Sequence, residues 1–320
     1  MKKTFATLLY PLVAILSILF SACSKESEEG GLEGSKLPGH IYHQYTTDVK
    51  KLNMQTGVES TFFSYSAYST VGWGLSRDGT LRIITSREAG VYDRTRFQIV
   101  NTASGTIEKE FDYIPLHGNS TNNFGQLSFD KSLILIEPDF HNGIVLLDTD
   151  GNIKLEMSGI NDETFTQGDE AIWLPDNGIL VTFKDRYILR ADPPYTNLIL
   201  IKEMNYEKWG NIRVSNNGQK ISMYIGNHIY MMDINGDHLV QVTESNDDEA
   251  FAEFSPDDKY LLVASDYFHA PASGNSHWYL KIIPADGKKY NLDSSPEVIP
   301  VIPKGENSLI KANKVTLWRP

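Results

Sequence analysis

The sequence predicts an all-β protein, a six-bladed β-propeller of four-stranded antiparallel blades. The first observation is a turn that recurs five times between short apolar segments, with its central Asp or Asn at positions 78, 130, 176, 217 and 257. These positions lie 52, 46, 41 and 40 residues apart, and a period of about 40 to 50 residues is typical of radial arrays of small sheets. The second is a composition with 24 glycines, 14 prolines and 11% aromatic residues, which suits many strands joined by tight turns.

Each recurring turn joins the first and second expected strands of a repeat. The five turns are Ser76-Arg77-Asp78-Gly79, Ser128-Phe129-Asp130-Lys131, Leu174-Pro175-Asp176-Asn177, Ser215-Asn216-Asn217-Gly218 and Ser255-Pro256-Asp257-Asp258. Asp and Asn side chains hydrogen-bond to nearby backbone groups in such turns, so these residues build the scaffold. We expect the variable loops to carry the function.

Every repeat contains four segments with the character of short strands joined by turns. The expected strands are 71–75, 81–85, 97–100 and 107–111; 124–127, 133–136, 144–147 and 153–157; 171–174, 179–183, 187–190 and 198–201; 211–214, 220–224, 229–232 and 239–243; and 251–254, 260–264, 278–283 and 289–292.

The third observation is that the two chain ends complete each other. Residues 41–65 contain three expected strands without an inner one, at 41–45, 49–53 and 59–65, while 314–320 is a strand without partners. Pairing the last strand with the first three forms a sixth blade and covers edges that would otherwise be exposed. The propeller domain is therefore expected over residues 38–320.

The N-terminus is expected to be a signal peptide over residues 1–22. Lys2 and Lys3 precede an apolar run, and Ser21 and Ala22 are the small residues that a signal peptidase requires. The run is short for a membrane helix and is broken early by a proline. The only cysteine, Cys23, follows directly, and a lone cysteine cannot form an internal disulfide.

Phe20-Ser21-Ala22-Cys23 resembles the lipobox of bacterial lipoproteins, with Phe20 where that motif prefers Leu. The resemblance implies that Cys23 is acylated and anchors the chain in a lipid bilayer; the alternative is a secreted protein with a chance cysteine. Residues 23–37 are acidic and rich in Gly and Ser, as expected of a flexible tether. The acidic run is similar to the surface-export signal of Bacteroidota lipoproteins, which implies an outer-membrane lipoprotein exposed at the cell surface. A plain solvated spacer, with the protein on the periplasmic face, is the alternative.

Charge and motifs exclude several classes of function. The 29 Lys and Arg against 41 Asp and Glu give a net charge of −12, which is unfavourable for nucleic acid. The sequence has no nucleophile elbow, phosphate loop or metal-spaced Cys/His cluster, so we expect no cofactor and no metal. Two Asp-rich segments beginning at Asp148 and Asp233 lack the remaining ligands of a calcium loop and are interpreted as turns. We expect a monomer.

Two segments resemble the repeat of TolB-type six-bladed propellers. They are Asn211-Ile212-Arg213-Val214-Ser215-Asn216-Asn217-Gly218, continuing to Ile229-Tyr230-Met231-Met232-Asp233-Ile234-Asn235-Gly236, and Phe254-Ser255-Pro256-Asp257-Asp258-Lys259-Tyr260-Leu261. The resemblance implies a periplasmic, protein-binding propeller with a separate N-terminal domain. The segment between Cys23 and Ile41 is too short for that domain. A structural role in an envelope complex is one function that the resemblance implies.

Candidate functional residues are expected on one face of the propeller. The recurring turns occupy one face, the turn face; the variable loops and blade connections occupy the other, the loop face, where binding residues are usually held. The candidate binding residues there are Trp209, Asn211, Glu249, Tyr68, Asn123, Asp169, Tyr267 and Phe268. Aromatic rings beside amides and carboxylates suit carbohydrate, although Trp209 fits packing between blades equally well.

Three functions remain open from the sequence. The first is a non-catalytic binding module for a glycan or an envelope protein. The second is a polysaccharide lyase or hydrolase acting on an acidic glycan, for which His117 and His269 are the candidate catalytic residues. The third is a structural component of an envelope complex.

Overall fold

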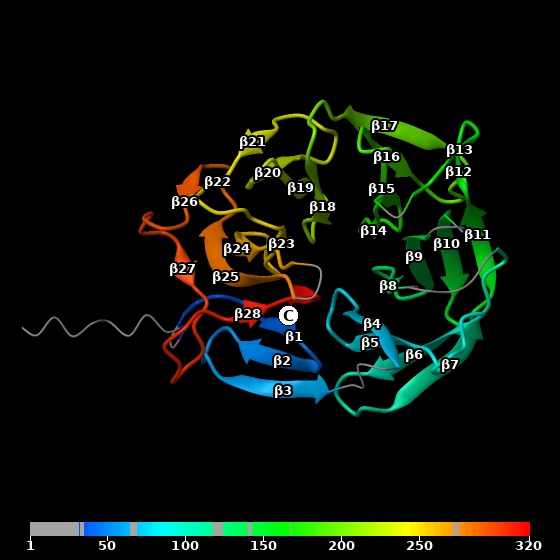
Figure 1. The fold of residues 1–320 in the computed structure, drawn as a ribbon, viewed down its shortest axis with the longest axis horizontal. Coiled ribbons are helices and arrows are strands. Elements are labelled where there is room, and N and C mark those ends of the chain that lie inside the picture. Colours follow the sequence, from blue (N-terminus) through cyan, green and yellow to red (C-terminus); the bar gives the residue numbers. More distant parts are fainter. Residues whose placement is uncertain are drawn as a thin grey trace, which may run out of the picture. The chain divides into compact units, whose positions relative to one another are not determined.

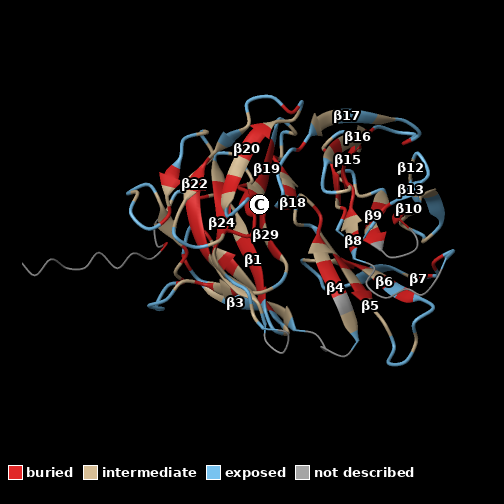
Figure 2. Cartoon of the chain, turned by 45° about the horizontal axis from the view of Figure 1, so that its top comes forward, coloured by how far each residue is buried: buried red, intermediate tan, exposed pale blue. Residues whose placement is uncertain are grey.

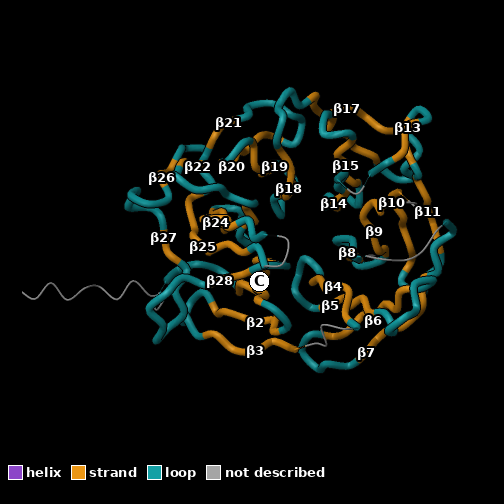
Figure 3. Tube along the Cα trace, in the orientation of Figure 1, coloured by secondary structure: helices purple, strands orange, loops and turns teal. Residues whose placement is uncertain are grey.

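Six antiparallel sheets surround a central axis as the blades of a β-propeller, which confirms the predicted fold class (Figure 1). The computed structural model describes residues 32, 35–64, 69–117, 124–139, 143–166, 168–271 and 275–320. In these ranges the chain forms strands and loops without a helix (Figure 3), so they offer no helix that could cross a membrane. The expected signal peptide and Cys23 lie outside the described residues.

Each blade runs from an inner strand at the axis to an outer strand at the rim. Blade 1 is β29 (Thr316–Arg319), β1 (His40–Tyr45), β2 (Asp48–Asn53) and β3 (Glu59–Ser64); blade 2 is β4 (Thr70–Leu75), β5 (Leu81–Ser86), β6 (Thr95–Asn101) and β7 (Ile107–Tyr113); blade 3 is β8 (Gly125–Leu127), β9 (Leu133–Asp139), β10 (Gly143–Asp148) and β11 (Ile153–Met157). Blade 4 is β14 (Ala171–Trp173), β15 (Ile179–Phe183), β16 (Tyr187–Ala191) and β17 (Leu198–Glu203); blade 5 is β18 (Trp209–Val214), β19 (Lys220–Ile225), β20 (His228–Asp233) and β21 (Val240–Gln241); blade 6 is β23 (Ala252–Phe254), β24 (Tyr260–Phe268), β25 (His277–Pro284), β27 (Ile299–Pro300) and β28 (Lys311–Ala312).

The recurring turn has the same hydrogen bonds in blades 2, 3, 5 and 6, whereas in blade 4 Leu174 replaces the serine and Asp176 accepts the backbone N–H of Gly178. In blade 2 the Ser76 hydroxyl donates to the Asp78 carboxylate at 2.6 Å and accepts the backbone N–H of Leu81 at 2.9 Å. Ser128 with Asp130, Ser215 with Asn217 and Ser255 with Asp257 repeat this arrangement. The side chains thus satisfy backbone groups at the bend, which explains why the motif marks each blade so regularly.

The last strand closes the ring on the first, as predicted. β29 pairs antiparallel with β1, with Trp318 opposite Ile41 and Arg319 opposite His40. Trp318 is fully buried and its indole N–H donates to the carbonyl oxygen of Pro38 at 2.7 Å. Leu32, which falls inside the segment expected to be a tether, is buried in the same apolar cluster. Leu32 therefore packs on the propeller, although it precedes the expected domain boundary at residue 38.

The outer part of blade 6 differs from the sequence prediction. Residues 289–292 were expected as its fourth strand, but β26 (Tyr290–Asn291) pairs in parallel with β22 (Thr243–Glu244) of the preceding connection. The outer positions on β25 are taken by β27 and β28 instead. The physical reason is burial, since Tyr290 and Leu292 enter the apolar cluster between blades 5 and 6. A short hairpin of β12 (Gly159–Ile160) and β13 (Glu163–Thr164) was also not expected.

Burial follows the position of a strand within its blade. Buried residues concentrate on the inner and middle strands, while outer strands such as β7 and β17 are largely exposed (Figure 2). The inner strands run from the loop face to the turn face, because each of β4, β8, β14, β18 and β23 leads directly into one of the recurring turns. Side chains of these strands that point toward the axis therefore form the wall of any central cavity.

Candidate functional site

A central cavity of about 650 Å³ is lined by the inner strands of all six blades. Its mouth, toward the loop face, includes Phe124, Lys208, Asp248, Tyr267 and His269. Its other end lies near the turn face and is formed largely by Arg77, Arg213, Glu253 and Arg319, which we call the floor cluster.

One carboxylate in the floor cluster contacts three guanidinium groups. Glu253 on β23 is 1% exposed. Its Oε1 lies 2.6 Å from Nη1 of Arg319 and 3.2 Å from Nη1 of Arg77, and its Oε2 lies 3.4 Å from Nε of Arg213. Burial by itself would raise the pKa of Glu253, but Arg319, Arg77 and Arg213 outweigh it and hold the pKa below its ordinary value. Glu253 is therefore ionised in the fold.

Arg77 crosses the axis at the turn face. It belongs to the recurring turn of blade 2, yet its Nη2 donates to the carbonyl oxygen of Val214 at the end of β18 in blade 5, on the opposite side of the ring. Its guanidinium also lies 5.3 Å from the ring centroid of Phe129 in blade 3. Burial, followed by the like charge of Arg319, lowers the pKa of Arg77 to about 10, so it remains cationic at neutral pH.

The wall on the side of blades 4 and 5 is shaped by a bulge in β18. Pairing with β19 shifts between Gly210 and Arg213, and Asn211 has a φ of 51°. The two backbone N–H groups withdrawn from the ladder, those of Asn211 and Ile212, donate to the carboxylate of Glu170 at 2.5 and 3.0 Å. Such a bulge re-aims a side chain, and here Asn211 is placed on the cavity lining.

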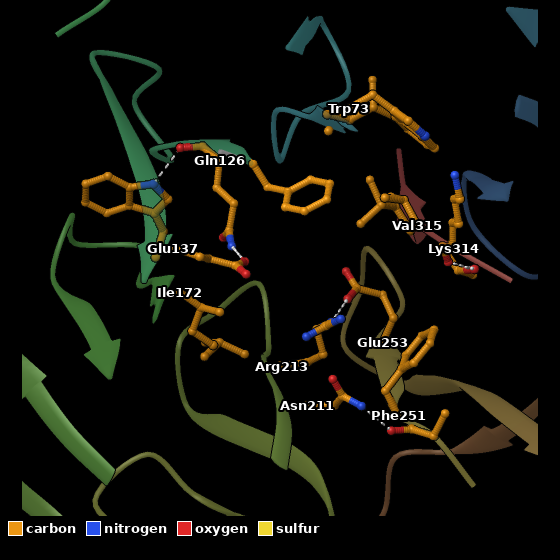
Figure 4. Close-up of a pocket in the computed structure, with 18 of the residues that line it drawn as sticks. Trp73, Gln126, Glu137, Ile172, Asn211, Arg213, Phe251, Glu253, Lys314 and Val315 are labelled. Carbon is orange, nitrogen blue, oxygen red and sulfur yellow. Dashed lines mark hydrogen bonds and ion pairs between the residues drawn. The ribbon is translucent and has the colours of Figure 1, made fainter. Parts of the chain in front are cut away.

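Glu137 lines the same cavity from blade 3. It is on β9 and accepts a hydrogen bond from the side-chain amide of Gln126 on β8. Figure 4 shows Glu137 and Gln126 on one side of the pocket, with Arg213 and Glu253 across from them. Burial, followed by the nearby charge of Glu170, raises the pKa of Glu137 to about 7. This carboxyl is therefore partly protonated at neutral pH.

Aromatic side chains gather at the mouth. The rings of Phe251 and Trp278 pack edge to face with centroids 5.4 Å apart, and the rings of Tyr267 and His269 lie 4.2 Å apart. Phe124, on the side of blades 2 and 3, lies so close to the backbone of Gly72 that a Cβ there would come within 2.1 Å of its ring. The mouth thus offers ring surfaces on two sides of the cavity.

The mouth also carries mixed charge. Asp248 lies 3.5 Å from Nζ of Lys208 and 3.3 Å from Nε2 of His269. In the described part of the chain, His, Cys, Asp and Glu side chains form no group that could hold a metal ion.

Four of the residues proposed from the sequence lie on the cavity: Asn211, Glu249, Tyr267 and His269. Glu249 is 3% exposed and accepts hydrogen bonds from Ser245 at 2.6 Å and Thr243 at 3.0 Å, and it pairs with His228 at 2.9 Å. Burial raises the pKa of Glu249. Tyr267 reaches the cavity from β24, which extends further than expected and bulges between Ser265 and Phe268.

The other proposed residues lie elsewhere. Trp209 is buried in the apolar cluster between blades 4 and 5 and donates to the carbonyl oxygen of Asp185, which is the packing alternative. Asp169 is buried and accepts the backbone N–H groups of Thr166 and Lys184. Phe268 is exposed on β24, and His117 pairs with Glu156 at 3.4 Å; both lie outside the cavity lining. Tyr68 and Asn123 lie outside the described residues.

Sequence reasoning missed the floor cluster and Glu137. The sequence did contain a pattern that could have revealed part of the cluster. In each of the five repeats, the residue two positions before the recurring turn lines the cavity. These residues are Gly74, Gln126, Ile172, Arg213 and Glu253. Aligning the repeats at this position would have revealed an Arg and a Glu facing the axis from neighbouring blades.

We predict that Glu137 makes the protein less stable as the pH rises. Its pKa is about 7 in the fold against an ordinary value of 4.5, so between these values the folded protein keeps a proton that the unfolded chain has lost. Stability from this group is complete below pH 4.5 and is lost as the pH rises through 7. Gln does not titrate, so the Glu137→Gln variant lacks this pH dependence. Its free energy of unfolding minus that of wild type should rise by about 3 kcal/mol from pH 4 to pH 8.

Denaturant unfolding at several pH values measures this difference. Glu207→Gln, a change at an exposed carboxyl, is the matched control and should follow wild type at every pH. Parallel curves for wild type and Glu137→Gln would contradict the assignment.

The comparisons with known proteins show the fold. No family model and no curated protein matches the sequence. Among solved structures, TolB from Acinetobacter baumannii is similar with a TM-score of 0.59 and 18% identity over 87% of this chain and 68% of that one. The putative TolB from Agrobacterium tumefaciens gives 0.55 and 14% identity over 79% and 87%. At these identities the likeness concerns the fold alone, so the structural neighbours of this chain are TolB-like six-bladed β-propellers.

Proposed function

We propose that this protein is a lipoprotein of the bacterial outer membrane, exposed at the cell surface, that binds a glycan without catalysis. In this proposal the ligand enters the central cavity from the loop face. The observation that carries the proposal is the cavity of about 650 Å³, which combines ring surfaces at its mouth with polar groups along its wall. Ligand sites in proteins have this volume and this mixture of apolar lining and few placed polar groups.

The side chains at the mouth suit a sugar. Phe124 is 40% exposed and Tyr267 is half-buried, so both keep ring area for the apolar faces of a pyranose. Asn211 and Glu137, deeper in the cavity, are placed to exchange hydrogen bonds with hydroxyl groups. A central cavity of this volume, lined by all six blades, favours the end of a glycan chain over the broad surface of a folded protein partner.

The proposal of a membrane anchor is based on the sequence alone. Ser21 and Ala22 before Cys23 form the lipobox-like motif, and several acyl chains on one residue hold a protein firmly, since each buried methylene contributes about 0.8 kcal/mol. The acidic segment after Cys23 supports export to the cell surface.

We predict that Cys23→Ala abolishes membrane anchoring. The variant should incorporate no labelled palmitate and should move from the detergent phase to the aqueous phase, because no other residue would carry the acyl chains. Ser24→Ala is the matched control and should partition like wild type. A Cys23→Ala protein that still partitions into detergent would refute the anchor, and resistance to protease on intact cells would place the protein on the periplasmic face.

We predict that Tyr267→Ala weakens glycan binding by at least about tenfold, because the loss of one stacked ring corresponds to roughly 1.4 kcal/mol. Phe268→Ala is the matched control, since Phe268 is the next residue on β24 and lies outside the cavity lining. A screen of neutral and acidic oligosaccharides by calorimetry gives the affinities. If both variants bind like wild type, the glycan does not enter the cavity, and capture of a folded envelope protein instead would favour the structural alternative.

One observation favours a second function, a polysaccharide lyase or hydrolase. A partly buried carboxyl with its pKa near 7, as at Glu137, is the kind of group that acid–base catalysis uses, and His269 lies on the same cavity. The oligosaccharides from the binding screen can be assayed for new chain ends after incubation. Turnover that is lost in Glu137→Gln would establish an enzyme, and intact oligosaccharides support the binding module.

A further inference from the structure

The guanidinium groups of the floor cluster outnumber the carboxylate that they contact. Three guanidinium groups contact the single carboxylate of Glu253. Asp258 is near enough to act on Arg77, but its carboxylate accepts the backbone N–H groups of Asn216 and Asn217 at 2.6 and 2.8 Å. It is therefore held in the turn of blade 5. Glu170 and Glu137 also act electrostatically on Arg213, and Glu137 is partly neutral because its pKa is about 7. Among the described residues, Glu253 is the one carboxylate in direct contact with the three guanidinium groups.

The guanidinium groups also have hydrogen-bond donors left over. Each arginine carries five N–H donors. Within the described part of the chain, the Nε atoms of Arg77 and Arg319 are buried and have no hydrogen-bond partner. An unpaired buried donor is costly, so these two arginines are incompletely paired inside the protein. Both Nε atoms are closed to solvent, so a ligand in the cavity would have to be contacted by another guanidinium.

Arg213 is the guanidinium that a ligand reaches. Its side chain is 31% exposed, against 18% for Arg77 and 8% for Arg319. Its Nη1 donates to the carbonyl oxygen of Ile212 and its Nε faces Glu253, so part of its planar fork remains open to the cavity. Figure 4 shows it projecting between the wall that carries Glu137 and the strand that carries Glu253.

We propose that the floor cluster is a subsite for a carboxylate of the glycan, with Arg213 as the contacting group and Arg77 and Arg319 as the charges behind it. This inference rests on the proposed function and narrows its ligand to an acidic glycan with a uronic acid residue at the inserted end. A planar guanidinium matches a carboxylate with two parallel hydrogen bonds. In this proposal the aromatic rings at the mouth contact the sugar ring, and the floor cluster binds its carboxylate.

The negative net charge of the protein means that the carboxylate of the glycan must be bound by contacts inside the cavity. At −12 the chain repels an acidic polymer at long range, so affinity for it must come from short-range contacts inside the cavity. Salt screens the long-range repulsion more strongly than a contact within the cavity.

The experiment compares matched pairs of oligosaccharides. Each uronic-acid-containing oligosaccharide is tested beside its carboxyl-reduced counterpart, which differs only at that group, and calorimetry on the full-length protein gives both affinities. Wild type should bind the acidic member at least about tenfold more tightly. In Arg213→Gln this preference should fall to about one while the affinity for the reduced member stays the same, and Arg213→Lys should restore part of the preference because it restores the charge.

The outcomes separate the two proposals. Equal affinity of wild type for both members of every pair overturns the carboxylate subsite without any variant, and leaves the glycan-binding function standing. A preference for the acidic member that survives in a folded Arg213→Gln protein also overturns it. If neither member of any pair binds, the proposed function fails, and the subsite fails with it.

Discussion

The ion pair between Arg319 and Glu253 joins the two blades at which the ring of this propeller closes. Arg319 is on β29, the closing strand of blade 1, and Glu253 is on β23 of blade 6. Both side chains are nearly fully buried, so removing them from water is costly and must be offset by good geometry and further hydrogen bonds. Arg319 supplies one of these by donating to the carbonyl oxygen of Trp318 at 2.8 Å. Arg77 reaches Glu253 from blade 2 and so links a third blade to the same carboxylate.

The same contacts that hold the ring together define the candidate site. Arg77 spans the ring at the turn-face end of the cavity, which leaves the loop face as the proposed entrance for a ligand. The bulge that places Asn211 on the wall is satisfied by Glu170 from the neighbouring blade, so the wall also depends on how the blades pack. Buried polar groups that are satisfied only in part are a cost to stability. Two such atoms, the Nε atoms of Arg77 and Arg319, lie at the floor of the cavity, and functional sites are places where such a cost is tolerated.

The blades could be predicted from the sequence because the turns that define them are held by hydrogen bonds between nearby residues. The side chains of each recurring turn bond to groups within five residues, as Ser76 and Asp78 do in blade 2 and Asp176 does in blade 4, so the blade boundaries can be predicted from neighbouring residues alone. The outer strands of blade 6 could not be predicted, since the choice between residues 289–292 and 299–300 depends on burial of Tyr290 between blades. In the site, the mouth residues Tyr267 and His269 were found from loop position, whereas Arg77 acquires its role only by reaching a strand 137 residues away in sequence. Trp209 had two equal interpretations, and only the packing of blade 4 on blade 5 decides between them.

A double-mutant cycle on unfolding free energy, using Glu253→Gln and Arg319→Met, tests most directly whether this pair couples the closing strand to blade 6. The account predicts a coupling of at least about 1.5 kcal/mol, because Glu253→Gln leaves the buried Arg319 without its carboxylate and Arg319→Met removes the nearest of the three guanidinium groups that contact Glu253. The exposed pair of Lys109 and Asp150 is the reference and should give less than about 0.5 kcal/mol. A coupling between Glu253 and Arg319 no larger than that of the exposed pair would contradict the account.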